Sequence, residues 1–206
     1  VGNVFGQGGS SLISRLLGQK DETGVRHVSS FCFYVTALLG VIIAVIMLVF
    51  RIPLLYVIGA SEETFSHASD YYFYLAVGAP AIMLSFIHSN LLRSEGMSKE
   101  SMEGTVLGAV VNIVLDPVFI SVLGWGAKGA AIATVVGYAV ADIFFVYVVD
   151  RKSKILSVNP KEIKIPSEHV GQVLGIGIPA AIVNLMQSLS VVLVNQFLLP
   201  FGNDKI

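Results

Sequence analysis

One apolar stretch decides the class of fold: Thr105-Val-Leu-Gly-Ala-Val-Val-Asn-Ile-Val-Leu-Asp-Pro-Val-Phe-Ile-Ser-Val-Leu123. As a helix rising about 1.5 Å per residue, it nearly spans a hydrocarbon core of about 30 Å. Asp116 lies in its middle, where a charge costs about 2.5–3.5 kcal/mol. Asn112 lies one turn earlier on the same face, and Pro117 removes a backbone donor directly afterwards. The stretch predicts a spanning helix with a cation or proton site; the alternative is a structural carboxylate bonded to a neighbouring helix.

The composition of the whole chain is that of a membrane protein. Charged residues make up 13% of the 206 residues, where soluble domains average about 25%, and hydrophobic residues make up 54%. We therefore predict an all-α, polytopic transmembrane bundle. Six stretches are long enough, or nearly so, to cross a bilayer, and they fall at 1–17, 31–50, 71–92, 105–123, 129–149 and 172–200.

The basic residues orient these spans. If the first span ends in the cytoplasm, ten of the 13 Lys and Arg residues fall in cytoplasmic loops, and the reverse topology would invert this bias. We expect a multi-pass protein of the cell (cytoplasmic) membrane. The three basic residues on the opposite side would be Arg51, Lys128 and Lys205.

The turn at 123–127 fixes the relative depth of two spans. Asp116 and Thr134 lie roughly nine residues on either side of it, about 13–14 Å away at the helical rise and close to the midplane. We therefore predict that Asp116, Asn112 and Thr134 share one polar pocket. Their oxygen ligands suit Na⁺, and a lone carboxylate at low dielectric can equally bind a proton.

Other polar residues in the spans invite either a functional or a structural interpretation. His88 could line a cavity as a proton relay, but a satisfied interhelical hydrogen bond is favoured. Asp142 is expected to pair with a Lys or Arg near the cytoplasmic end. Pro80 is expected to kink its span. Cys32, the only cysteine, excludes an intrachain disulfide and is expected to be buried.

The last fifty residues change in character. Residues 151–169 are polar and basic and contain two prolines, which is typical of a linker between two halves. The following span contains Pro179, a predicted kink, and the polar Asn184 and Gln187, which we expect to line a cavity. The chain also opens within an apparent helix and without Met, so we expect a fragment whose preceding helix is missing.

Five stretches together resemble the multidrug and toxic compound extrusion (MATE) transporters along essentially the whole chain. Each is weak alone, but they occur in the right order and spacing. They are Ser11-Leu-Ile-Ser-Arg-Leu-Leu-Gly-Gln-Lys-Asp21, Leu91-Leu-Arg-Ser-Glu-Gly96, Asn112-Ile-Val-Leu-Asp-Pro117, Gly126-Ala-Lys-Gly-Ala-Ala-Ile-Ala-Thr134 and Ile176-Gly-Ile-Pro-Ala-Ala181.

The resemblance implies half of a two-lobe, twelve-helix transporter, from its second to its seventh helix. Residues 1–150 would form the amino-terminal lobe without its first helix, 151–169 the cytoplasmic connection, and 170–206 the first helix of the second lobe. The family exchanges Na⁺ or H⁺ for organic, often cationic, drugs by alternating access. Its cation site would fall on an acid of the absent helix and on Asn112, Asp116 and Thr134, with no other cofactor.

Two other functions are alternatives to drug export. A lipid-linked oligosaccharide flippase of related fold would be expected to carry several basic residues deep in its spans, and none lies there. A non-transporting membrane scaffold would gain little from an intramembrane charge such as Asp116.

Enzymatic and nucleic-acid functions find no support in the sequence. The chain has no nucleotide loop, no metal-ligand cluster and no usable Ser/His/Asp set, so we expect no enzyme. Its basic cluster at 151–164 lies beside the bilayer, where it would contact lipid headgroups rather than nucleic acid. The expected partners are small organic cations, membrane lipids and the remainder of the same polypeptide.

Overall fold

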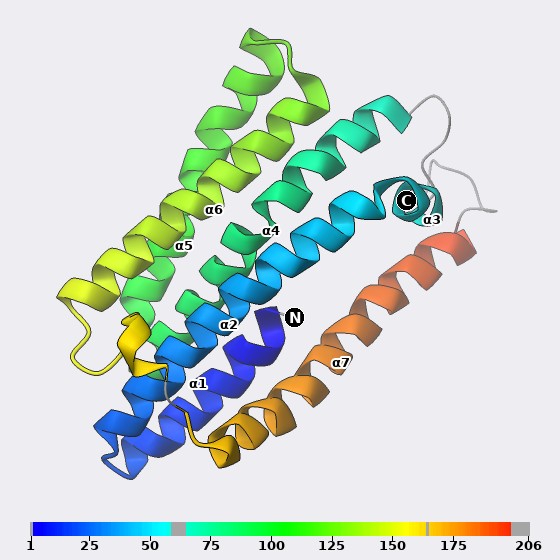
Figure 1. Cartoon of the computed structure of the whole chain (residues 1–206). Coiled ribbons are helices and arrows are strands. Elements are labelled where there is room, and N and C mark those ends of the chain that lie inside the picture. Colours follow the sequence, from blue (N-terminus) through cyan, green and yellow to red (C-terminus); the bar gives the residue numbers. More distant parts are fainter. Residues whose placement is uncertain (1, 59–64, 164, 199–206) are drawn as a thin grey trace.

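The computed structural model describes residues 2–58, 65–163 and 165–198, which fold into long helices joined by short loops (Figure 1). No strand occurs in these ranges. The α-helices are α1 (Gly2–Gly18), α2 (Glu22–Val49), α3 (Arg51–Ile58), α4 (Phe65–Ser94), α5 (Ser98–Pro117), α6 (Gly126–Arg151) and α7 (Ser167–Leu198). A π-helical turn follows α5 at Val118–Val122, and a 3₁₀ turn lies at Pro160–Glu162.

Five of the described helices are long and apolar enough to cross a membrane, which confirms the all-α polytopic bundle. They coincide with five of the six predicted spans but are longer, because polar end turns continue the helical hydrogen bonding outside the hydrocarbon. In α2, for example, Asp21 caps the helix by accepting a bond from the Gly24 backbone N–H at 2.9 Å. The remaining predicted span, α1, has only 17 residues and falls short of this length.

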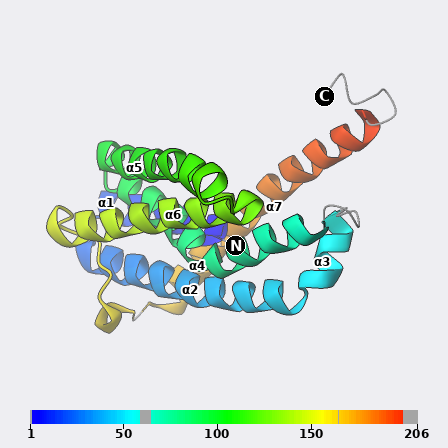
Figure 2. The ribbon, with the colours of Figure 1, turned by 90° about the horizontal axis from the view of Figure 1, so that it is seen from above.

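The helices pack in an order that differs from their order along the chain. The α5–α6 hairpin packs on α4, and α4 packs on α2 and α1. On the other side, α7 packs against α1, as Figures 1 and 2 both show. The carboxy-terminal half of α7 points away from the other helices (Figure 2). The α4–α6 group therefore forms a unit in which a site can be built, separate from α7.

One hydrophobic core joins α1, α2, α4 and α6 with the start of α7. Cys32 is fully buried in it, as predicted from its isolation in an apolar helix. By contrast, α5 is largely exposed, as expected of a helix that meets lipid or another part of the protein. The largest fully buried side chains include Leu12, Ile13, Val25, Ile87, Leu92, Phe145 and Val173.

The predicted linker is not detached from the bundle. Its residues 152–163, which we name the strap, lie along α2 and the end of α4. Tyr34 donates a hydrogen bond to the Val158 carbonyl at 2.9 Å, and Ser30 donates one to the Ser157 carbonyl at 3.0 Å. The Ser153 hydroxyl donates to the Glu95 carboxylate at 2.6 Å. These bonds hold the strap in place at the end of the molecule where we expect the cytoplasm.

The three prolines predicted to kink helices lie at different kinds of position. Pro80 lies inside α4, where its backbone touches α2 at Gly40: a Cβ added there would lie 2.8 Å from Pro80 Cα. Pro179 lies inside α7. Pro117 ends α5 and is followed directly by the π-helical turn, so the α-helical hydrogen-bond ladder changes at that point. Kinks at Pro80 and Pro179 stay predictions.

Helices α1 and α7 approach each other closely, and we expect this contact to contribute to the stability of the protein. A Cβ on Gly8 would collide with the Val173 carbonyl of α7, whereas a Cβ on Gly18 of the same helix would meet nothing within 4 Å. We expect Gly8→Ala to lower the free energy of unfolding of the full-length protein by about 1–3 kcal/mol, because the two backbones must separate.

Thermal unfolding in detergent measures this effect. The matched control, Gly18→Ala, should be neutral or slightly stabilising, because Ala favours the helix and the space is open. Equal stability of the two variants would show that the α1–α7 contact is not tight in solution.

Candidate functional site

The site begins with two glycines at which α5 and α6 touch. A Cβ on Gly108 would lie 2.8 Å from the Gly137 carbonyl oxygen, and a Cβ on Gly137 would lie 2.7 Å from the Gly108 carbonyl oxygen. Only glycine allows both backbones to come this close, which is a common device of membrane helices. The contact fixes how the neighbouring side chains of the two helices face each other.

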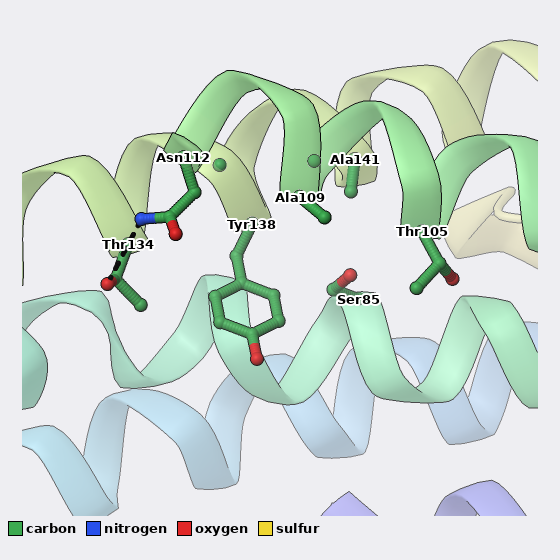
Figure 3. Close-up of a pocket in the computed structure, with 9 residues that line it drawn as sticks. Ser85, Thr105, Ala109, Asn112, Thr134, Tyr138 and Ala141 are labelled. Atoms are coloured by element: carbon green, nitrogen blue, oxygen red, sulfur yellow. Dashed lines mark hydrogen bonds between the residues drawn. The ribbon is translucent and has the colours of Figure 1, made fainter. Parts of the chain in front are cut away.

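A cavity of about 230 Å³ opens beside this contact, between α4, α5 and α6 (Figure 3). The lining positions on α5 and on α6 follow the same spacing of zero, three, four and seven residues, which marks one face of a helix. The cavity is lined by Thr105, Gly108, Ala109 and Asn112 of α5, by Thr134, Gly137, Tyr138 and Ala141 of α6, and by Ser85 of α4.

Asn112 connects the two helices at one end of the cavity. Its amide nitrogen donates to the Thr134 hydroxyl at 3.4 Å, the bond drawn in Figure 3, and to an Asp116 carboxylate oxygen at 3.5 Å. The Thr134 hydroxyl in turn donates to the Ala130 carbonyl at 2.9 Å. Both Asn112 contacts are long for hydrogen bonds, so the three side chains are grouped without being locked together.

These three side chains fit a small hard cation chemically. They offer a carboxylate oxygen, a hydroxyl oxygen and, when the Asn112 amide rotates by half a turn, a carbonyl oxygen. Oxygen donors of this kind suit hard cations, and the carboxylate supplies the compensating charge. The same carboxylate can instead bind a proton, after which the group carries no net charge.

The structure places the three predicted ligands within reach of one another, as the depth of the hairpin predicted. Asn112 and Thr134 line the cavity, whereas Asp116 is half-buried one turn beyond its end and does not line it. Asp116 therefore reaches the cavity through Asn112. Whether the three bind a cation or a proton stays a prediction.

The favoured prediction for His88, an interhelical hydrogen bond, is confirmed, whereas the expected pairing of Asp142 with a Lys or Arg is wrong. His88 does not line the cavity; its side chain is 2% exposed and its Nδ1 lies 3.3 Å from an Asp142 carboxylate oxygen. Asp142 accordingly pairs with His88 rather than with a Lys or Arg. The packing around α4 explains the difference: Ser85 lies at the cavity, whereas His88, one turn later, is buried against Phe33 of α2 and Phe145 of α6.

Asn184 and Gln187 were predicted to line a cavity, and neither lines the one between α4, α5 and α6. The Asn184 amide donates to the Ala180 carbonyl of its own helix at 2.8 Å, and the Gln187 side chain is exposed. The reason is the position of α7. Its Gly177 already lies against Val4, near the start of α1, so later residues extend past their neighbour.

Sequence reasoning missed three polar residues of the cavity: Tyr138, Thr105 and Ser85. A signal was available for two of them, because Tyr138 lies one turn after Thr134 and Thr105 lies two turns before Asn112 on the same helix faces. Ser85 carried no such signal, because its place depends on how α4 rotates against the hairpin.

A family model, a named relative and solved structures all place the chain in the same family. The MatE family model matches residues 1–118. The multidrug export protein MepA of Staphylococcus haemolyticus is 38% identical over 205 residues, which is 100% of this chain and 45% of the relative.

Two solved structures are described as conformations of a multidrug resistance MATE family transporter of the MOP superfamily. The outward-facing one matches with a TM-score of 0.87 at 31% identity, over 95% of this chain and 44% of that chain. The inward-facing one matches with a TM-score of 0.81 at 32% identity, over 87% of this chain and 41% of that chain. The chain thus spans less than half the length of these proteins.

The contribution of the Asn112–Thr134 contact to the stability of the protein can be measured. Replacing Thr134 with Val removes the hydroxyl that accepts the Asn112 amide, and we expect a loss of about 0.5–1.5 kcal/mol in the free energy of unfolding of the full-length protein. Thr134→Ser keeps the hydroxyl and should retain most of the stability. If thermal unfolding in detergent ranks the Ser variant below the Val variant, the hydroxyl does not hold α5 to α6.

Proposed function

This chain belongs to the MatE family, and we propose that it forms the amino-terminal part of a multidrug exporter driven by a cation gradient. The chemical basis is the group of Asp116, Asn112 and Thr134, which sets a carboxylate and two polar partners beside a cavity inside apolar helices. The named relatives are transporters rather than enzymes, and their export function is carried over to this chain as part of the proposal.

The size of the cavity suggests which ligand it holds. At about 230 Å³ it is smaller than the roughly 300–1,000 Å³ of typical drug pockets, but it has room for an ion and a few waters. We assign it to the coupling ion, Na⁺ or H⁺. A small organic cation would then bind in the space between this half and the remainder of the polypeptide.

Ion and drug need not touch each other in this scheme. A negative Asp116 in an apolar environment carries a desolvation penalty, and binding of Na⁺ or a proton removes it. If the site is more favourable in one arrangement of the helices, the ion shifts the population toward that arrangement. The inward- and outward-facing states described for relatives are the two arrangements that alternating access requires.

The same proposal assigns the parts of the chain and their place in the cell. Residues 1–150 belong to the amino-terminal lobe, the 151–169 segment is the cytoplasmic connection, and 170–206 opens the second lobe. The protein would sit in the cytoplasmic membrane, with most of its basic loop residues inside the cell.

The test is efflux of a fluorescent cationic dye from vesicles that contain the full-length protein, under a pH gradient and a Na⁺ gradient imposed separately. We expect efflux to follow one of the two gradients and to be lost in Asp116→Asn, because the amide can neither be protonated nor supply the ion's countercharge. Asp150→Asn is the matched control, since that carboxylate is exposed at the far end of α6.

Dye movement that ignores both gradients and the Asp116 substitution would contradict the proposal. Asp116 would then be a structural carboxylate. Loss of efflux in both Asp variants alike would mean that the effect is not specific to the site.

A further inference from the structure

A second titratable pair lies outside the proposed ion site. His88 of α4 and Asp142 of α6 meet at 3.3 Å, with side chains 2% and 14% exposed. Both residues lie in helices long and apolar enough to span the membrane. Nothing in the coupling scheme around Asp116 uses them, so their presence in the core needs its own explanation.

The surroundings of His88 leave one of its ring nitrogens free. The ring lies between the aromatic rings of Phe33 and Phe145, at centroid distances of 5.1 and 6.2 Å. Its Nε2 is buried and has no hydrogen-bond partner. When Nδ1–H is donated to Asp142, Nε2 presents a lone pair that can accept a proton without breaking the bond between the helices.

The pair stands directly behind the wall of the cavity. Ser85, one turn before His88, and Ala141, next to Asp142, both line the cavity and are drawn in Figure 3. On α6, Thr134 and Tyr138 precede Asp142 at intervals of one turn. A single face of this helix thus leads from the Asn112 contact to the pair.

The other titratable or charged side chains near the pair are few. Arg93, one turn beyond Ser89 on α4, is engaged by the hydroxyls of Ser89 and Ser101 at 2.6 and 3.1 Å. The helices packed around the pair carry Tyr138 on α6 at the cavity, Cys32 and Tyr34 on α2, Glu103 on α5 and Arg15 on α1. In the described part of the chain, His88 and Asp142 are each other's only charged contact.

We propose that His88 and Asp142 form a second proton-binding site that takes up one proton from the cavity. Without that proton, the pair holds a buried carboxylate and a neutral imidazole and carries a charge of minus one. With it, Nε2 carries an N–H bond made from its lone pair, the imidazolium balances the carboxylate, and the pair is neutral overall. Because buried net charge is unfavourable, the proton strengthens the contact between α4 and α6 that forms the cavity wall.

The use of this site in export rests on the function proposed above, but proton binding itself can be measured without transport. Potentiometric titration of the purified full-length protein is compared with that of the double variant His88→Gln/Asp142→Asn. Subtracting the two curves should reveal the loss of one bound proton. His88→Gln alone, which keeps an amide donor toward Asp142, serves if the double variant does not fold.

The matched control is Ser89→Ala. It removes a buried interhelical hydrogen bond next to His88, between the hydroxyls of Ser89 and Ser101 at 2.9 Å, but no titratable group. Its titration curve should superimpose on that of the wild type. Asp116→Asn should remove a separate component with its own midpoint and leave that of the pair in place.

Dye efflux then reports whether the site takes part in transport. We expect the pH midpoint of efflux to move by about one unit in His88→Gln and to stay unchanged in Ser89→Ala. A flat difference curve overturns the proposal. A one-proton difference with an unaltered pH profile of efflux supports the proton site and overturns its use in export. If the wild type shows no gradient-driven efflux, the proposed function fails, while the titration still decides whether the pair binds a proton.

Discussion

The structure depends on one constraint: inside a hydrocarbon layer there is no water to satisfy a polar group, so each must find a partner in the protein. Asn112 meets this demand with Thr134 and Asp116, and His88 meets it at Nδ1 with Asp142, while its buried Nε2 is an exception. Thr105 and Ser190 bond back to carbonyls of their own helices. Polar residues therefore decide which faces of α4, α5 and α6 turn toward one another.

Such pairing requires helices that approach closely, and glycine makes this possible. At Gly108 and Gly137 the backbones of α5 and α6 are in contact, and at Gly104 a Cβ would collide with the ring of Phe145. Because lipid is as apolar as the helix surfaces, this packing, not the hydrophobic effect, holds the hairpin together. Asn112 and Tyr138, on the same helix faces, line the cavity beside this contact.

A structural feature could be predicted from the sequence when its cause lies in residues close together along the chain. The grouping of Asn112 with Thr134 was predictable, because a short hairpin sets the relative depth of two neighbouring helices. The His88–Asp142 pair and the place of Ser85 were not, since they follow from the rotation of α4, which is set by packing against helices distant in sequence. The docked strap escaped prediction for a related reason. Tyr34 and Ser30 bind its backbone carbonyls, which every sequence provides.

The ion site lies just beyond the last buried residue of α5. The buried residues of α5 are Ser101, Gly104 and Gly108, and none lies beyond Gly108. Asn112 and Asp116 follow in the half that the described bundle holds least, and Pro117 with the π-helical turn then interrupts the regular hydrogen bonding. A segment with few buried contacts can shift at small cost, whereas one anchored through Gly108 cannot. A charge change at Asp116 therefore acts on a segment with few buried residues, between the glycine contact at Gly108 and the close approach of Phe119 to Gly129.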